Sequence, residues 1–234
     1  ASAGDVCLVN LATQFLDVVA VNVVVIFHQF VDVSLRTEFD DAVGNRLDKL
    51  VVVGRKEDVA LELLEVVESE KLLDTGGAIK KAMTLFDDES PVLVHNVDIM
   101  HDINLRDMYE TYAYKSDATL LVSQRKTSRY LLVDSHGCLK GWTNINTGEV
   151  KSPIDCVIQH PDDYERVAFS GIHFFSRNLL NQMNTWCDRF SIIDFYLDVC
   201  NKYDISVVNL PNMKLLDVGK LDTITEAERF VTSL

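Results

Sequence analysis

Short apolar runs alternate with amphipathic segments along most of the chain, and this alternation predicts the order of its strands and helices. The short runs are rich in Val, Leu and Ile, as buried strands are. The predicted strands are Val18–Phe27, Lys49–Val53, Pro91–Asn96, Ala118–Ser123, Tyr130–Val133 and Ile205–Asn209. The predicted helices, which follow the helical repeat, are Glu57–Val67, Gly77–Leu85, Leu105–Tyr114, Arg177–Asn184, Ser191–Lys202 and Thr223–Val231. Strands that alternate with helices favour an α/β fold with a largely parallel sheet.

The middle of the chain has a different pattern, in which short strand-like runs are separated by tight turns. The runs are Tyr130–Asp134, Leu139–Trp142 and Glu149–Ser152, with turn sequences at His136-Gly137 and Asn146-Thr147-Gly148. Glycine and asparagine in such positions are typical of hairpin connections. This arrangement predicts a β-meander.

The expected fold is therefore a Rossmann-like open mixed sheet, largely parallel and flanked by helices, with a β-rich insertion. No repeat, low-complexity tract or Pro/Gly-rich linker divides the 234 residues, so we expect a single domain over residues 1–234. The insertion is expected at about residues 125–167, after which Ala168–Phe175 is expected to return to the main sheet.

Composition and charge narrow the classes of function. The chain is 47% hydrophobic and 25% charged, which is typical of a globular protein. Its formal net charge of −14 argues against a broad nucleic-acid surface, which needs basic patches. The apolar stretch Asp17–Val33 contains several polar residues and is too short for a membrane span. We therefore expect a cytoplasmic protein without a nucleic-acid or membrane partner. The five cysteines lack metal-site spacing and predict reduced, mostly buried thiols.

Two apolar runs end in an acidic residue. One is Val92–Asp98 and the other is Met213–Asp217. Such a run is typical of a buried strand that delivers a carboxylate to the edge of an open α/β sheet, where ligands bind. Mg²⁺ takes one or two protein carboxylates and completes its shell with substrate phosphates and water. Each acid alone could equally cap a turn, and Asp102 could replace Asp98, but together Asp98 and Asp217 favour a metal–phosphate site.

Two glycine motifs suggest a close approach of the backbone to a ligand. Gly76 and Gly77 precede a helical pattern, where paired glycines and free N–H groups can meet a flat or anionic ligand. An ordinary capped turn has the same sequence. Gly171 lies inside the strand pattern Phe169–His173, where a glycine marks either a bulge or a contact with a ligand.

Taken in this order, four short motifs resemble those of the sugar-phosphate nucleotidyltransferases, the family of mannose-1-phosphate guanylyltransferases and N-acetylmuramate-1-phosphate uridylyltransferases. The motifs are Leu73–Gly77, Asn96–Asp98, Phe169–His173 and Leu216–Gly219. The resemblance covers the chain from about residue 72 to its C-terminus.

The resemblance implies an enzyme that joins a nucleoside triphosphate to a sugar 1-phosphate, giving an NDP-sugar and pyrophosphate. It also implies Mg²⁺ as the cofactor, because the metal neutralises developing charge and aligns the phosphates. Asp98 and Asp217 would be the catalytic residues that hold this metal. By the same resemblance, the substrate-binding residues would be Thr75, Gly76, Gly77, Asn96 and Gly171.

The N-terminal part departs from the family pattern, which opens with a Gly-rich loop carrying an Arg, followed by a Pro-Lys segment. No Arg or Lys precedes Arg36. Cations elsewhere in the chain, such as Lys80, Arg125 or Lys140, could take their place. Arg125 opens a basic cluster that either meets substrate phosphate or, as we slightly prefer, forms a solvated loop.

The same departure is also compatible with a catalytically silent nucleotide-sugar binding relative. A third explanation is an incomplete or wrongly assigned N-terminal sequence, and the close match of the later motifs favours it. A metal-dependent glycosyltransferase that uses Asp98 and Asp102 is a further alternative. The base, the sugar and the oligomeric state stay open.

Overall fold

The computed structural model describes residues 22–26, 51–57, 60–66, 73–83, 90–96, 98–217, 226 and 229–230, and in the first three ranges it describes the backbone strands alone. The strands are β1 (Asn22–Ile26), β2 (Val51–Glu57), β3 (Ala60–Val66), β4 (Val92–Asn96), β5 (Ile99–His101), β6 (Ala118–Ser123), β7 (Arg129–Val133), β8 (Leu139–Asn144), β9 (Glu149–Lys151), β10 (Glu165–Phe175), β11 (Ile205–Asn209) and β12 (Leu215–Asp217). The helices are α2 (Asp74–Ala82), α3 (Leu105–Tyr112), α4 (Asp155–Gln159), α5 (Arg177–Gln182) and α6 (Ile192–Val199), with short 3₁₀ turns η2 (Pro161–Asp163) and η3 (Met183–Thr185).

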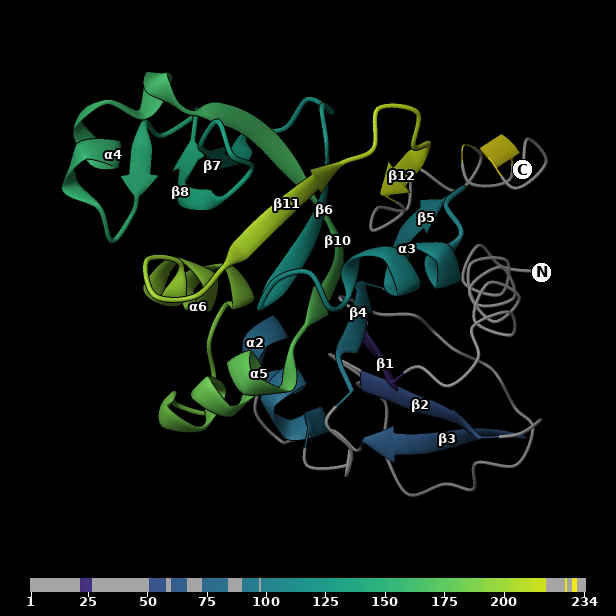
Figure 1. Cartoon of the computed structure of the whole chain (residues 1–234). Coiled ribbons are helices and arrows are strands. Elements are labelled where there is room, and N and C mark those ends of the chain that lie inside the picture. Colours follow the sequence, from purple (N-terminus) through teal and green to yellow (C-terminus); the bar gives the residue numbers. More distant parts are fainter. Residues whose placement is uncertain are drawn as a thin grey trace.

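The strands form a mixed sheet with the order β3-β2-β1-β4-β10-β7-β8-β9, and β6 pairs with both β10 and β11. The open mixed α/β sheet flanked by helices that the sequence predicts is confirmed (Figure 1). Parallel pairing is less extensive than expected, because among the described strands only β1 with β4 and β6 with β11 run parallel. The reason is β10, which inserts antiparallel between β4 and β6 and so divides the parallel strands into two pairs.

The long strand β10 joins the main sheet to the predicted meander. Its first part, Glu165–Val167, pairs with β7, and its later part pairs with β6 and β4. Strands β7, β8 and β9 follow one another as antiparallel neighbours, which confirms the meander. In Figure 1 the meander and α4 lie at one end of the sheet, opposite β1–β3.

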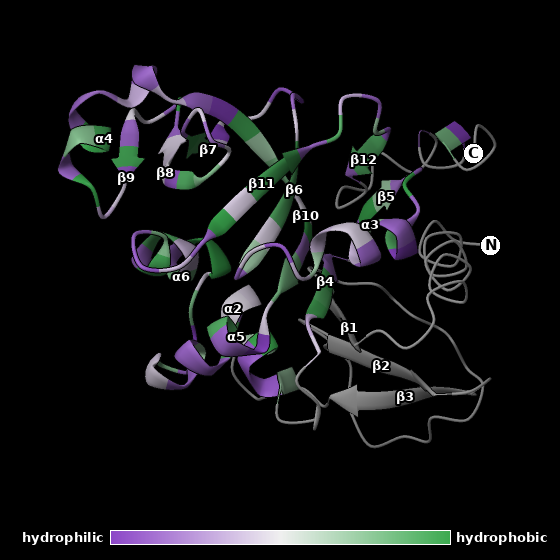
Figure 2. Ribbon diagram, in the orientation of Figure 1, coloured by the Kyte–Doolittle hydropathy of each residue, from purple (hydrophilic) through white to green (hydrophobic). Residues whose placement is uncertain are grey.

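Helices cover both faces of the sheet and bury two apolar clusters. On one face, Val92 and Val94 of β4 pack in a cluster with residues of α2, α5 and α6. On the other face, Leu93 packs with residues of α3 and β5. This alternation is the two-residue period of a strand that is buried on both sides. Figure 2 shows hydrophobic residues along β4 and β11 and hydrophilic residues on α5 and around α4.

Side-chain caps explain where three of the helices begin. The Asn104 side chain accepts hydrogen bonds from two backbone N–H groups at the start of α3. Ser176 and Ser191 each accept one such bond at the starts of α5 and α6. These caps satisfy N–H groups that the first turn of a helix leaves without partners.

One predicted helix is wrong, because most of the segment Glu57–Val67 forms strand β3. Its apolar residues fit a helical repeat and a short strand equally well, which periodicity alone cannot separate. Pairing decides the matter, since β3 pairs along its whole length with β2, from Glu57 opposite Ala60 to Val51 opposite Val66. Of the predicted last helix, Glu226, Arg229 and Phe230 are described, and they are helical.

The described cysteines and helices bear on two further expectations. Cys138, Cys156, Cys187 and Cys200 are free thiols, but only Cys200 is buried, so the expectation of mostly buried thiols is wrong. The two exposed ones, Cys156 and Cys187, lie in α4 and in the connection before α6, and neither belongs to an apolar cluster. Within the described residues, every helix is too short or too polar to cross a bilayer.

Candidate active site

The two acids predicted to bind a metal lie together next to the end of β4. Asp98 stands between the end of β4 at Asn96 and the start of β5 at Ile99. The last residue of β12, Asp217, is the register partner of Ile99 in the antiparallel β5–β12 pair. Figure 1 shows β5 and β12 side by side near α3. The pairing of β12 with β5 therefore places Asp217 opposite Ile99, the residue that follows Asp98.

The Asp98 carboxyl has an environment that disfavours its ionised form. Burial, and then the negative charge of Asp217, raise its pKa from 3.8 to about 6. One of its oxygens, Oδ1, is buried without a hydrogen-bond partner in the described part of the chain. A buried polar atom normally has such a partner. Two like charges and an unpaired oxygen are the features that a bound cation would relieve.

The donor set fits Mg²⁺. Carboxylate oxygens are the ligands that this hard cation prefers, and it usually takes only one or two of them. No group of three or more His, Cys, Asp or Glu side chains that could hold a metal occurs among the described residues. Asp98 and Asp217 would therefore leave the remaining metal positions to water and to substrate phosphates.

A bulge in β10 shapes the backbone beside these acids. The register between β10 and β6 shifts between Phe169 and His173. Within the bulge, the Ser170 hydroxyl donates a hydrogen bond to the Leu121 carbonyl at 2.7 Å and accepts one from the Ile172 N–H at 3.2 Å. These bonds replace ladder bonds that the bulge interrupts. Bulges of this kind are frequent next to active sites.

Gly171 is required at this bulge for two reasons. Its φ of +82° lies in the left-handed region, which L side chains rarely adopt. A Cβ atom on Gly171 would also lie 2.9 Å from Nδ2 of Asn96. The Asn96 side chain thus packs directly over Gly171, and its Oδ1 is buried without a hydrogen-bond partner in the described chain. The structure therefore brings together Asn96, Asp98, Gly171 and Asp217.

A buried pair of histidines flanks the segment that carries Asp98. The Nε2 atoms of His95 and His101 are 2.9 Å apart, and both side chains are fully buried. Burial lowers the pKa of His101 to about 4 and that of His95 well below its usual value. Both rings are thus neutral at pH 7, so one can donate to the other. Their hydrogen bond joins the last residues of β4 to the end of β5 and closes the intervening loop.

The predicted Thr75–Gly77 motif occupies the first turn of α2. Cβ atoms on Gly76 and Gly77 would lie 2.3 Å from the Phe190 ring and 2.0 Å from the Asp188 carbonyl oxygen, respectively. The Gly76 N–H also donates to the Phe190 carbonyl at 3.0 Å. In this structure the glycine pair lets residues 188–190 pack closely against α2. Its role in substrate binding stays a prediction, as does that of Thr75.

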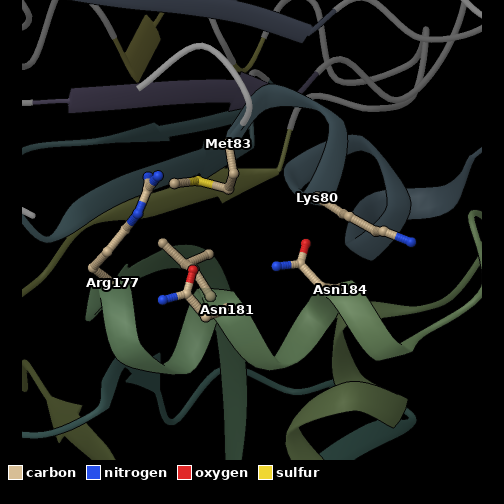
Figure 3. A pocket seen from close by; sticks show the side chains of 6 residues that line it. Lys80, Met83, Arg177, Asn181 and Asn184 are labelled. Atoms are coloured by element: carbon tan, nitrogen blue, oxygen red, sulfur yellow. The ribbon is translucent and has the colours of Figure 1, made fainter. Parts of the chain in front are cut away.

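A cavity of about 150 Å³ lies between α2 and α5 (Figure 3), and none of the acids described above lines it. In Figure 3, Lys80 and Arg177 point to opposite sides, and the amides of Asn181 and Asn184 lie between them. Nζ of Lys80 donates to the Trp186 carbonyl at 2.7 Å and pairs with Asp188 at 3.2 Å. This cavity is therefore separate from the acids near β4.

The structure separates the three cations that the sequence offers in place of the N-terminal loop. Lys80 pairs with Asp188, and Lys140 pairs with Asp134 at 3.3 Å. Arg125 instead lies beside the bulge, where its Nη2 donates to the Phe169 carbonyl at 3.2 Å. Its charge also acts to lower the pKa of Asp98. A solvated loop, the slightly preferred interpretation of Arg125, does not account for this contact with the bulge. No local sequence signal indicates the contact.

A comparison of the sequence with protein-family models and with curated proteins finds no match. Solved structures share the fold at low identity. HddC from Yersinia pseudotuberculosis, complexed with GMP-PN, is 19% identical with a TM-score of 0.50, and the match covers 70% of this chain and 65% of HddC. A UDP-glucose pyrophosphorylase complexed with UDP-glucose is 14% identical with a TM-score of 0.53, covering 71% and 65%.

A protein from Bacillus anthracis described as a glucose-1-phosphate thymidylyltransferase is 10% identical with a TM-score of 0.55, covering 71% of this chain and 64% of that one. The match thus spans somewhat less than two thirds of these larger proteins. At these identities the likeness concerns the fold. The chain therefore has the mixed α/β fold found in solved NDP-sugar pyrophosphorylases and sugar-phosphate nucleotidyltransferases.

Proposed function

We propose that this chain is a Mg²⁺-dependent nucleotidyltransferase that joins a nucleoside monophosphate from an NTP to a sugar 1-phosphate. The observation that carries the proposal is the meeting of Asp98 and Asp217 next to the end of β4, where one buried Asp98 oxygen lacks a partner among the described residues. The fold is shared with a protein solved with GMP-PN and with one solved with UDP-glucose, and this supports a nucleotide or nucleotide sugar as the ligand.

The proposed reaction requires little covalent chemistry from the protein. An oxygen of the sugar 1-phosphate would attack the α-phosphorus of the NTP, the bond to the β-phosphate oxygen would break, and pyrophosphate would leave. Asp98 and Asp217 would hold Mg²⁺, which when bound supplies charge neutralisation and alignment of the phosphates. Asp98 directly precedes β5 and Asp217 ends β12, so their separation is set by the β5–β12 pairing rather than by local flexibility.

Asn96 and Gly171 would shape the substrate side of the site. The left-handed Gly171 has no side chain, and the Asn96 amide that packs over it has an acceptor oxygen available. A ligand hydroxyl could donate to that oxygen. Such a hydrogen bond would orient a polar ligand, and orientation of this kind contributes strongly to two-substrate reactions.

The test is to incubate the purified protein with Mg²⁺, each NTP and a panel of sugar 1-phosphates, and to measure released pyrophosphate. We expect release with at least one pair, and its loss on adding EDTA. Asp98→Asn should abolish it, whereas Glu110→Gln, which neutralises an exposed acid on α3, should not. An undiminished rate in Asp98→Asn would contradict the assignment of this site.

The same assay separates the two alternative functions. A silent nucleotide-sugar binding relative would bind an NDP-sugar without releasing pyrophosphate from any pair. A metal-dependent glycosyltransferase would transfer sugar from an NDP-sugar to an acceptor, also without pyrophosphate. A cytoplasmic location belongs to the same proposal, and the four described free cysteines accord with a reducing compartment.

A further inference from the structure

Several buried polar atoms without hydrogen-bond partners gather around the bulge in β10. Among the described residues these include Oδ1 of Asn96, Oδ1 of Asp98, Oγ of Ser123 and Nε of Arg125. Native proteins pair the great majority of such atoms with protein or with ordered water. Unpaired acceptors and donors on both sides of one bulge are atoms that a polar ligand could pair.

These residues converge on the same stretch of β10 from two neighbouring strands. Ser123 is the register partner of Ala168, at the start of the bulge. Arg125, two residues later, donates from Nη2 to the Phe169 carbonyl. On the other side of β10, Asn96 packs over Gly171, and Asp98 follows it. The bulge therefore separates a guanidinium, contributed after β6, from a carboxylate, contributed after β4.

The Arg125 guanidinium is held in place but not neutralised. Its hydrogen bond to the Phe169 carbonyl fixes one Nη2 and leaves the other donors available. Within the described residues no carboxylate lies within ion-pair distance of Arg125, whereas Lys80, Lys140 and Arg166 each pair with an aspartate. A planar, permanently charged guanidinium with free donors matches the oxygens of a phosphate group.

We propose that Arg125 binds a substrate phosphate at the same site as the two acids proposed to bind the metal, and so supplies a cation that residues 1–35, which contain no Arg or Lys, do not. The inference rests on the proposed function. In this arrangement Asp98 and Asp217 would hold the cation, and Arg125 would bind the phosphate beside it. The phosphate could belong to the sugar 1-phosphate or to the nucleotide, since both present the same oxygens.

A phosphate-binding role and a purely structural role of Arg125 predict different changes in phosphate and metal affinity. Removing the Arg125 charge weakens phosphate binding but removes a repulsion felt by the metal ion. Metal affinity without phosphate should therefore stay constant or rise. If Arg125 only stabilised the bulge, its loss would disturb Asn96 and Asp98 and would weaken both ligands together.

The experiment compares wild type with Arg125→Gln, Arg125→Lys and the matched control Arg129→Gln, which removes an exposed arginine from the same basic cluster. Mn²⁺ binding is followed by the loss of the free-ion signal in electron paramagnetic resonance. Inorganic phosphate, glucose 1-phosphate and GTP are then titrated calorimetrically in the presence of Mn²⁺. Urea midpoints report whether each variant folds.

We expect Arg125→Gln to weaken binding of at least one phosphate probe by about tenfold to a hundredfold, with Mn²⁺ affinity unchanged or higher. Arg125→Lys should recover part of this loss, and Arg129→Gln should match wild type. A loss confined to glucose 1-phosphate assigns Arg125 to the sugar phosphate, and one confined to GTP assigns it to the nucleotide.

Two outcomes overturn the inference while leaving the proposed function intact. One is wild-type phosphate affinity in Arg125→Gln, and the other is a parallel loss of Mn²⁺ and phosphate affinity with a lowered urea midpoint. Wild-type protein that binds Mn²⁺ but none of the three phosphate probes also overturns it. Absence of both Mn²⁺ and phosphate binding in wild-type protein contradicts the proposed function itself, and with it the role of Arg125.

Discussion

Replacing Asp98 by asparagine should stabilise the metal-free protein while removing the proposed metal site. The carboxyl and the amide have nearly the same shape, so packing changes little. The carboxylate, in contrast, is ionised at neutral pH in surroundings that disfavour its charge, because it is buried and faces Asp217. The native state thus carries an electrostatic cost at this position that asparagine does not.

The size of this cost follows from the pKa of Asp98, which rises from 3.8 to about 6. Each pKa unit corresponds to about 1.4 kcal/mol, so ionisation costs the native state about 3 kcal/mol relative to the unfolded chain. Since the folded pKa is the higher one, stability is fully present below about pH 4 and falls as the pH rises through 6. The gain from Asp98→Asn should therefore be about 2–3 kcal/mol at pH 7.5 and close to zero near pH 4.

The assay is urea unfolding of wild type, Asp98→Asn and the surface control Glu110→Gln in EDTA at several pH values. The free energy of unfolding should rise in Asp98→Asn, with a gain that grows between pH 4 and pH 7. Adding Mg²⁺ should stabilise wild type, since a ligand that binds only the native state adds to its stability, but not Asp98→Asn. A variant less stable than wild type at pH 7.5, or a gain independent of pH, would refute the reasoning.

Three further substitutions test the surroundings of the site. Gly171→Ala should lower the free energy of unfolding by about 1–3 kcal/mol more than Gly148→Ala in urea titrations, because both have positive φ but only Gly171 has a side chain within 4 Å of the added Cβ. Equal losses would contradict the close packing at Gly171. His101→Gln should reduce the acid sensitivity of stability, because wild type, with a folded pKa of about 4 against 6.5, loses up to about 3 kcal/mol as pH falls from 6.5 to 4. An unchanged pH profile would count against the neutral buried histidine. Gly77→Ala should lower the thermal midpoint in differential scanning calorimetry by more than Gly148→Ala does, because its Cβ would lie 2.0 Å from the Asp188 carbonyl oxygen. A midpoint no lower than that of Gly148→Ala would contradict this close packing and indicate that the segment around Asp188 moves aside at little cost in stability.

Several elements could be read from the chain because their signals are local. Ala118–Ser123 and Ile205–Asn209 were predicted with the bounds that the structure has, since both are short apolar runs flanked by polar residues. The glycine in Phe169–His173 indicated either a bulge or a contact with a ligand, and the structure shows a bulge there. The segment Glu57–Val67 was wrong because its apolar spacing suits a helix and a strand alike, and only pairing with β2 distinguishes them.

The sequence by itself determined which residues are candidates for the chemistry, namely an acid after each of two apolar runs and a glycine within a strand pattern. Those features are local, because burial, capping and backbone freedom depend on near neighbours. Only the tertiary structure decided that Asp98 and Asp217 meet, through the β5–β12 pairing, and that Arg125 lies across the bulge from them. Proximity between distant segments depends on strand register and on the folding of the sheet as a whole, and no short pattern encodes it.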